Sequence, residues 1–405
     1  MSKLQELIDQ YCPNGVPFKK LDEILDYEQP TQYIVKSTKY DDSYKTPVLT
    51  AGQTFILGYT NEDSGIYKAD KIAPTIIFDD FTTSFHWVDF DFKVKSSAMK
   101  MLRPKSTFDG SFRYVFYAME CINFEAVNHT RHWISKYSQI EIPLPPPPIQ
   151  EEIVKILDRF AEYAAELQAE LQARQEQYEY YRDKLLSFNN INGGGCARVT
   201  WMKMNEILYS IRTGLNPRQF FKLNTPDAHS YYVTIREFNG GRLVFSDSTD
   251  RINESARMLC NNRSNLEIND VLFSGTGTIG ETFVIDSTPL NWNIKEGVYA
   301  LKPKLHIIYP KYLKYILSQS EIKSDYIKLA EGGTVKSISM KKLNVFSIPV
   351  PTLSEQERII NILDKFEALT SDLSQGLPAE IAAVQEQYEY YRDKLLSFPK
   401  YKLSA

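Results

Sequence analysis

A glycine-rich segment is the first feature of this chain whose residue spacing suggests chemistry. Gly275-Thr-Gly-Thr-Ile-Gly280 matches the pattern G-x-G-x-x-G, which is typical of loops that bind dinucleotides or S-adenosylmethionine. That loop needs a following helix, but Thr282–Ile285 is rich in β-branched and aromatic residues and predicts a strand. We therefore expect a glycine-rich hairpin that approaches another surface closely, where its backbone amides could bind a DNA phosphate.

Histidines and carboxylates offer two further candidate sites. His129 and His132 are three residues apart, but no spaced set of Cys, Asp or Glu completes a metal site, so structural or surface roles are expected. Asp79 and Asp80 have three open interpretations: a catalytic or metal-binding pair, a reader of cytosine N4, or a structural turn.

Catalytic motifs are missing from the rest of the sequence. Asp91-Phe-Lys93 resembles the acidic-x-Lys part of a nuclease site, yet the alternating pattern of Val88–Val94 explains it as a strand with one buried face. We find no Asn- or Asp-Pro-Pro-aromatic methyltransferase motif and no phosphate-binding Walker loop. The sequence therefore predicts no catalytic residues and no metal site in this chain.

Two polar stretches next to glycines are suited to reading DNA bases. Gly214–Arg218 offers an Asn that can grip adenine and an Arg that can grip guanine, although a solvated turn is the alternative. Gly52–Gly65 is similarly polar, and Lys93 and Lys95 nearby are expected to contact phosphates. The predicted DNA-binding residues are Gln53, Tyr59, Thr60, Asn61, Lys93, Lys95, Asn216, Arg218, Lys222, Arg236, Thr276 and Gly277.

An internal repeat must position these stretches. The same fourteen residues occur unchanged at Gln175–Phe188 and Gln385–Phe398, and related segments precede both copies. The first copy follows Ile156-Leu-Asp-Arg-Phe160, and the second follows Ile362-Leu-Asp-Lys-Phe366. The chain is thus a two-fold repeat in which a variable arm alternates with a shared segment.

Each shared segment predicts a long helix. Apolar residues recur in steps of three and four from Ile153 to Phe188 and from Ile359 to Phe398, which is a heptad seam. The second copy is four residues longer before its repeat, and Gly376-Leu-Pro378 lies there, so a kink or short break is expected. The prolines before each helix favour a stiff joint over a polyproline ligand.

The arms are predicted to be divergent copies of one α+β domain. Phe18–Ile24 and Trp201–Ile207 open the two arms alike. Strands are expected at Tyr231–Ile235 and Val298–Leu301, and a helix at Tyr309–Leu317.

Charge is divided unevenly along the 405 residues. The net charge of −4 separates into about −9 on the shared helices and about +5 on the remainder. A basic balance on the arms suits a DNA-binding surface, because an electrostatic footprint belongs to a surface rather than to the whole chain. Four scattered cysteines and no apolar run long enough to cross a membrane lead us to expect a cytoplasmic protein.

This organisation resembles the specificity subunit of type I restriction-modification enzymes. The resemblance covers essentially the whole chain and rests on the two divergent arms, the near-identical helices ending Tyr-Glu-Tyr-Tyr-Arg-Asp-Lys-Leu-Leu, and the Ile142-Pro-Leu-Pro and Ile348-Pro-Val-Pro segments. It implies two target-recognition domains separated by two helices that pair as an antiparallel intramolecular coiled coil. The implied divisions are 1–145 and 191–350 for the recognition domains, 146–190 and 351–398 for the helices, and 399–405 for a tail.

The resemblance also implies a division of labour among subunits. This chain would be a non-catalytic DNA reader without a cofactor, each arm reading half of a bipartite asymmetric site in double-stranded DNA. Two methyltransferase subunits would use S-adenosylmethionine to methylate adenine N6, and two motor-nuclease subunits would use ATP and Mg. The residues predicted to face these partners are Tyr180, Arg182, Tyr390 and Arg392, with plain solvent exposure as the alternative.

Two other classes of function fit the sequence less well than a DNA reader. A self-contained nuclease or methyltransferase would need the catalytic motifs that the sequence lacks. A generic coiled-coil scaffold would not need two large arms whose charge balance differs from that of the helices.

Overall fold

The computed structural model describes residues 3–52, 54–125, 130–188, 199–289, 291–371 and 376–401. It divides into two compact units, one of Met1–Ala165 with Ala383–Ala405 and one of Glu166–Ala382. Each unit therefore holds one arm together with part of each shared helix. The linear domain boundaries predicted from the sequence stay a prediction.

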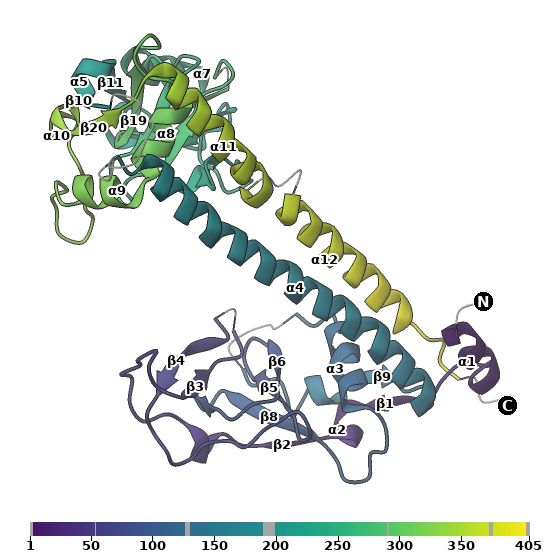
Figure 1. Cartoon of the computed structure of the whole chain (residues 1–405). Helices are drawn as coiled ribbons and strands as arrows, with labels where there is room; N and C mark the ends of the chain where they lie inside the picture. Colours follow the sequence, from purple (N-terminus) through teal and green to yellow (C-terminus); the bar gives the residue numbers. More distant parts are fainter. Residues whose placement is uncertain are drawn as a thin grey trace. The chain divides into compact units, whose positions relative to one another are not determined.

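The first unit contains an α+β arm (Figure 1). Its helices are α1 (Lys3–Tyr11), α2 (Leu21–Ile24) and α3 (Phe112–Glu120), with short 3₁₀ turns η1 (Thr31–Tyr33) and η2 (Tyr137–Gln139). Its strands are β1 (Phe18–Lys20), β2 (Leu25–Glu28), β3 (Thr46–Leu49), β4 (Ile56–Thr60), β5 (Thr75–Asp79), β6 (Phe85–Val88), β7 (Lys93–Val94), β8 (Met99–Pro104) and β9 (Glu141–Pro143).

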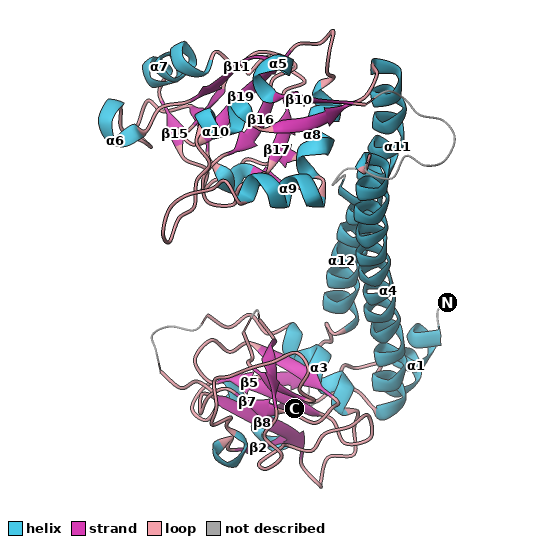
Figure 2. Cartoon of the chain, turned by 60° about the vertical axis from the view of Figure 1, so that its left-hand side comes forward, coloured by secondary structure: helices cyan, strands magenta, loops and turns pink. Residues whose placement is uncertain are grey.

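The second unit contains an arm with the same kinds of element (Figure 2). Its helices are α5 (Met204–Ile207), α6 (Pro217–Phe220), α7 (Glu254–Ser264), α8 (Pro310–Ser318), α9 (Ser320–Ile327) and α10 (Met340–Val345), with the turn η3 (Ile235–Glu237). Its strands are β10 (Thr200–Lys203), β11 (Leu208–Thr213), β12 (Ser230–Val233), β13 (Phe238–Asn239), β14 (Arg242–Leu243), β15 (Arg251–Ile252), β16 (Val271–Ser274), β17 (Thr282–Val284), β18 (Trp292–Ile294), β19 (Val298–Pro303) and β20 (Ser347–Val350).

The two arms share one sheet topology. A four-stranded sheet has the order β2-β8-β5-β6 in the first arm and β11-β19-β16-β17 in the second. A three-stranded sheet has the order β4-β3-β7 in the first arm and β15-β12-β18 in the second, and β3–β7 and β12–β18 are its parallel pairs. The pairs β1–β9 and β10–β20 close the entry and exit of each arm. This match confirms that the arms are divergent copies of one α+β domain.

The shared segments form long helices, as predicted. Helix α4 (Pro147–Leu186) is continuous, and α11 (Leu353–Ser371) and α12 (Gly376–Leu395) make up the second copy. The separate helix α12 begins at Gly376, where a break was predicted, and residues 372–375 lie outside the described ones. Gly376 has a φ of 74°, a conformation that favours glycine.

Within each unit the two shared helices pack against each other through aromatic rings. In the first unit Phe160 stacks on Tyr391, with ring centroids 5.6 Å apart. In the second unit Tyr181 stacks on Phe366 at 5.7 Å. In the second unit the end of α4 meets the start of α11, so the paired segments run antiparallel there, with Leu186 and Ile359 in one core.

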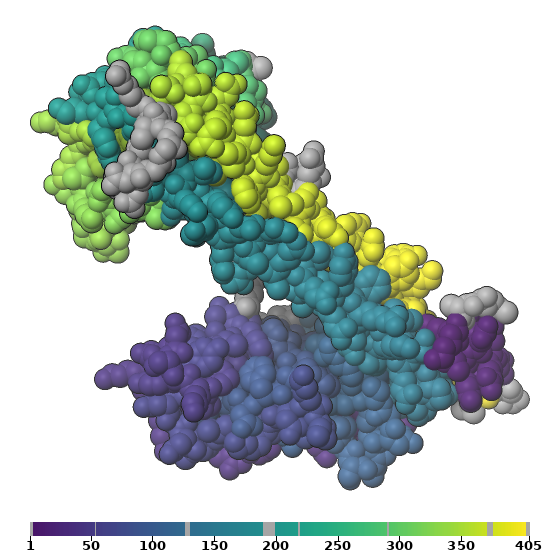
Figure 3. All heavy atoms as spheres, in the orientation of Figure 1, coloured from purple at the N-terminus to yellow at the C-terminus, as the bar shows by residue number. Residues whose placement is uncertain are grey.

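One hydrophobic core of each arm is shared with its helices. Ile153 and Leu157 of α4 are fully buried together with Tyr114 of α3 and Ile142 of β9. Ile359 and Leu363 of α11 are buried in the same way against α8 and β20. Figure 3 shows α11 (yellow-green) lying along the second arm, and α1 lying against the first turns of α4. Each arm is therefore packed directly onto its shared helices.

The structure corrects one predicted strand and confirms two other predicted elements. The segment from Val88 to Val94 is not one strand, because β6 ends at Val88 in the four-stranded sheet and β7 begins at Lys93 in the three-stranded sheet. The apolar and charged residues of this segment alternate while the chain passes from the four-stranded sheet to the three-stranded sheet. The predicted helix at Tyr309–Leu317 and the strand at Val298–Leu301 are confirmed as α8 and part of β19.

Candidate nucleic-acid interface

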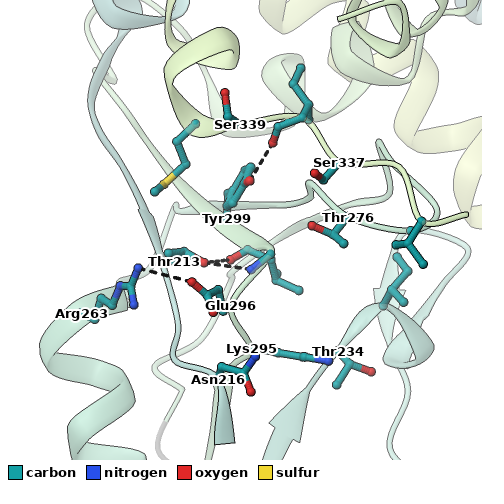
Figure 4. A pocket seen from close by; sticks show the side chains of 17 residues that line it. Thr213, Asn216, Thr234, Arg263, Thr276, Lys295, Glu296, Tyr299, Ser337 and Ser339 are labelled. Carbon is teal, nitrogen blue, oxygen red and sulfur yellow. Dashed lines mark hydrogen bonds and ion pairs between the residues drawn. The ribbon is translucent and has the colours of Figure 1, made fainter. Parts of the chain in front are cut away.

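A cleft of about 610 Å³ opens on the second arm where several chain segments meet (Figure 4). The end of β11, the residues after β12 and β18, the β16–β17 hairpin and the stretch before α10 all contribute to it. Its polar and charged lining residues are Thr213, Asn216, Thr234, Arg263, Thr276, Lys295, Glu296, Ser337 and Ser339.

The walls of this cleft are fixed by backbone contacts. Thr276 forms a bridge with Ser337, and the Gly277 N–H donates to the Lys336 carbonyl at 3.0 Å. Tyr299 closes the interior by donating its hydroxyl to the Ile338 carbonyl at 2.7 Å. Burial, assisted by Glu296, raises the pKa of Tyr299, so its hydroxyl stays a neutral donor. The cleft therefore has a rigid frame with polar side chains around it.

Lys295 is the charged group best placed to act on a ligand. Its backbone N–H donates to the Val233 carbonyl at 2.9 Å, which holds it at the end of β18. The side chain extends toward Thr234 (Figure 4), and among the described residues its ammonium group has no hydrogen bond or ion pair. By contrast, the guanidinium group of Arg263, on the same cleft, forms an ion pair with the Glu296 carboxylate at 3.7 Å. An unpaired cation beside hydroxyls and an amide suits a phosphate group.

The first arm holds a lysine at the matching position. The Lys95 N–H donates to the Leu49 carbonyl at 3.0 Å, just as Lys295 does to Val233, and both lysines follow the parallel central strand pair. The Lys95 ammonium lies 3.3 Å from the Tyr40 hydroxyl and over that ring. Lys95 was predicted from the sequence and Lys295 was not, although aligning Lys93-Val-Lys95 with Asn293-Ile-Lys295 would have found it.

Two first-arm candidates are unavailable for direct DNA contact. Lys93 is 1% exposed, and its ammonium donates to the Ser64 carbonyl at 2.7 Å and pairs with Glu62 at 3.1 Å. Thr60 is also 1% exposed, on β4. The prediction is corrected at these two positions, because both side chains belong to the interior. Tyr59 is half-buried, Asn61 is exposed, and Gln53 lies outside the described residues.

The glycine-rich loop is a hairpin between β16 and β17, as predicted. Its amides are occupied, however: Gly275 donates to Gly297, Gly277 to Lys336 and Gly280 to Ser274. The suggested phosphate cradle of bare amides is therefore wrong for these three glycines. Gly277 keeps open space in front of it, so a ligand can approach closely.

The remaining second-arm candidates differ in availability. Thr276 and Asn216 line the cleft, and Lys222 is exposed. Arg236 is largely exposed but already pairs with Asp250 at 2.6 Å. The backbone of Arg218 lies in α6, and its side chain is outside what the structure describes, so its role stays a prediction.

The paired aspartates of the first arm have structural roles. Asp79 accepts from the N–H groups of Phe81 and Thr82, both at 2.9 Å, and so closes a turn. Asp80 is 1% exposed, accepts from the Trp133 N–H and lies 3.4 Å from the Lys100 ammonium. These contacts support the turn among the three open interpretations.

No metal site is found in the described part of the chain. No group of three His, Cys, Asp or Glu there could hold an ion. His132 is fully buried, and His129 lies outside the described residues.

The predicted partner-facing residues separate into two kinds. Tyr180 and Tyr390 are 59% and 60% exposed, each with a lysine four residues later stacked over its ring at 5.6 Å. Arg182 is buried and bonds to Ser320 of its own arm. Arg392 lies 4.0 Å from Glu120 of its own arm. The arginines therefore face inward, contrary to the prediction, and only the tyrosines are presented outward.

Known proteins are similar to this chain in sequence and in fold. The family model for the type I restriction modification DNA specificity domain matches residues 13–177 and 211–383. The chain is 42% identical over 99% of its length to the EcoR124I/EcoR124II specificity subunit of Escherichia coli, of which it covers 98%. It is 30% identical over 95% of its length to a putative type I restriction enzyme specificity subunit of Haemophilus influenzae, of which it covers 96%. The chain belongs to the family of type I restriction-modification specificity subunits.

Solved structures support the same fold for this specificity subunit. The S subunit of M. genitalium has a TM-score of 0.52 at 15% identity, with 96% of this chain and 97% of that chain covered. A chain from a study of assembly and conformational transition of a type I restriction-modification system has a TM-score of 0.57 at 17% identity, with 96% and 98% covered. A specificity subunit is non-catalytic and recognises DNA through two target-recognition domains, and the enzymatic activities belong to other subunits. Among the described helices, none is long and apolar enough to cross a membrane.

Gly214 offers a test of the cleft's frame. A Cβ at this position would lie 1.6 Å from the Ile294 carbonyl oxygen, next to Lys295. We expect Gly214→Ala to lower the free energy of unfolding by about 1–3 kcal/mol, because backbone must move to relieve the overlap. Gly333→Ala is the control, since a Cβ there meets nothing within 4 Å. Equal thermal melting of the two variants would contradict this packing.

Proposed function

We propose that this specificity subunit recognises a bipartite, asymmetric DNA site, each arm reading one half. The observation that carries the proposal is the placement of Lys95 and Lys295 at the same position of two arms with one topology. A repeated fold with a repeated cation supports two similar DNA-binding modes. The side chains around these lysines differ between the arms, which supports two different half-sites.

The cleft of the second arm has the chemistry for reading bases. Asn216 can pair with adenine, and the hydroxyls of Thr276 and Ser337 can donate to or accept from base edges. Lys295 would hold a phosphate and so set the register of the duplex against these groups. The excess positive charge of the arms favours DNA approaching them rather than the acidic helices.

We further propose that the shared helices set the gap between the half-sites. Helix α4 has 40 residues, which corresponds to about 60 Å at about 1.5 Å per residue. Half-sites that paired domains recognise lie about one helical turn of DNA apart, which is about 34–36 Å. A helix of this length can span that distance.

The partners are also part of the proposal. Two methyltransferase subunits would bind the two copies of the shared segment, use S-adenosylmethionine and methylate adenine N6. Two motor-nuclease subunits, with ATP and Mg, would complete the restriction complex. The outward Tyr180 and Tyr390 support one kind of partner binding twice, because their surroundings on the helix are repeated residue for residue.

The free thiols of Cys12, Cys121 and Cys260 fit a reducing cytoplasm.

The function is tested by adding the methyltransferase subunits. The purified chain alone should neither methylate nor cleave DNA, whereas the assembled methyltransferase should modify one bipartite sequence. Methyl transfer by the homogeneous chain alone would favour the enzyme alternative. Assembly without any sequence preference in DNA binding would favour the scaffold alternative.

Lys295→Ala should weaken DNA binding by the assembled methyltransferase for all sequences alike. If the ammonium neutralises one phosphate, the slope of log affinity against log salt should fall by about 1, and by about 2 when Lys95→Ala is added. Titrations at several salt concentrations measure this slope. Lys155→Ala removes the same charge from an exposed position of α4 and serves as the control. If the slope falls equally in the control, Lys295 has no specific contact with a DNA phosphate.

Inserting four residues after Leu171 should lengthen the gap and leave both half-sites unchanged. Four residues are about one helical turn, so the apolar face stays in phase while the helix grows by about 6 Å, equivalent to one or two base pairs. Sequencing the methylated sites of cells that express the variant complex reads both the bases and the gap. An active complex with the original gap would contradict the spacer role of the helix.

Tyr180→Ala should weaken binding of one methyltransferase subunit, and Tyr180→Ala with Tyr390→Ala should weaken both. Exposed aromatic residues often dominate binding energy when a partner covers them, so we expect about 2 kcal/mol for each site. Analytical ultracentrifugation of mixtures gives the number of bound subunits. Tyr209→Ala, 69% exposed on β11, is the control. If the double variant binds as many methyltransferase subunits as the unaltered chain, these tyrosines face solvent and do not contact the partner.

A further inference from the structure

A buried glutamine joins each arm to its shared helix. In the first unit Gln150, in the first turn of α4, accepts from the N–H of Ser111, the N-cap residue of α3, at 2.8 Å. It also donates to the Pro145 carbonyl at 2.6 Å. The residue is only 2% exposed, so both ends of its amide depend on these partners.

The second unit repeats this arrangement. Gln356 accepts from the N–H of Tyr309, the N-cap residue of α8, at 2.9 Å, and donates to the Pro351 carbonyl at 2.9 Å. It also donates to Ile307, and it is fully buried. In both units one side chain thus connects the start of the shared helix, the proline segment and the N-cap residue of the arm's own helix.

Two tyrosines on the arm's helix add further contacts to each joint. Tyr114 donates to the Pro143 carbonyl at 3.1 Å, and Tyr312 donates to the Pro349 carbonyl at 2.9 Å. One turn later, Tyr117 and Tyr315 donate in the same way to carboxylates of the shared helices. Those carboxylates are Asp158 and Asp364, the aspartates of the two Ile-Leu-Asp segments.

A cation completes each joint. Arg113 lies 2.9 Å from Asp158, and Lys311 lies 2.6 Å from Asp364. Burial, and then the hydrogen bond to Asp158, raises the pKa of Tyr117, so that its hydroxyl remains a donor at neutral pH.

These contacts persist although the surrounding residues differ. Helices α3 and α8 read FRYVFYAME and PKYLKYILS, and the two tyrosines are the only identical residues when their joints are superimposed in register. Hydrophobic packing alone would accept many other side chains at these positions. Directional hydrogen bonds at both ends of a glutamine instead define one orientation of arm and helix.

We infer that these two joints are positioning devices for the spacing of the half-sites. A domain of about 100 residues has a radius of gyration of about 13 Å, so a pivot of about 15° shifts its surface by about 3.4 Å, which is one base-pair step. A joint that allowed such a pivot would let one complex accept neighbouring gap lengths. The inference rests on the proposed function, and adds to it that gap selectivity depends on the joints as well as on helix length.

The test replaces each glutamine by an apolar residue of similar length. Gln150→Met and Gln356→Met are expressed singly with the methyltransferase subunits, and methylated sites are sequenced genome-wide. We expect the same half-site bases, with methylation at gaps one base pair longer or shorter rising at least tenfold over the unaltered complex. Gln172→Met, at an exposed position on α4 whose amide donates to Glu176 of the same helix, is the control and should keep a single gap. An active Gln→Met complex restricted to the original gap would overturn the inference.

Milder variants keep the test decisive if a methionine variant does not assemble. Tyr117→Phe and Tyr315→Phe lose only the hydroxyl contacts and should also relax the gap, whereas Tyr209→Phe, at an exposed position of β11, should keep it. A single gap in both Tyr117→Phe and Tyr315→Phe would overturn the inference on its own. If the unaltered complex showed no bipartite motif, the proposed function itself would fail, which separates the two claims.

Discussion

The buried hydrogen bonds of Gln150 and Gln356 are the constraint on which each unit's geometry depends. Around each glutamine the hydrophobic core runs without interruption from the arm's sheet into the first turns of the shared helix, through Ile153 in one unit and Ile359 in the other. An amide buried there must keep both partners, because unpaired buried polar groups are costly. The arm can therefore change its outer loops freely, provided that the N-cap of its own helix and the preceding proline segment stay in place.

This constraint explains how constant and variable parts coexist in one chain. The parts that repeat are those that touch the joint and the helix seam: Tyr114 and Tyr312, Asp158 and Asp364, and the stacked pairs Phe160–Tyr391 and Tyr181–Phe366. The cleft of the second arm lies among loops after β12 and β18, and its lining residues do not belong to the joint. Specificity for different DNA sequences can thus change without altering the frame.

The sequence predicted the frame well and the site only in part. Exact duplication and heptad spacing are local signals, so the helices, the break at Gly376 and the paired arms could be anticipated. The burial of Lys93 could not, because it depends on Glu62 and on the Ser64 and Gly65 carbonyls, which only the folded loop brings together. Lys295 was missed because its importance comes from its match with Lys95. The two lysines match because each follows a parallel strand pair and donates its backbone N–H to the neighbouring strand, and no sequence motif marks this. The joints were missed for a similar reason: Asp158 and Asp364 were visible as a repeated motif, but their tyrosine partners lie on helices with little other likeness.

An exchange of one arm tests the central claim, that two independent readers are mounted on a common frame. Residues 200–350 would be replaced by the corresponding arm of the Escherichia coli relative, and the methylated sequence of the assembled complex would be determined. Gln150, Asp158, Gln356 and Asp364 of the shared helices would stay unchanged. The account predicts that one half-site changes to one of the relative's half-sites, while the other half-site stays as it was. Simultaneous change of both half-sites would contradict it, because the arms would then read the DNA as one surface.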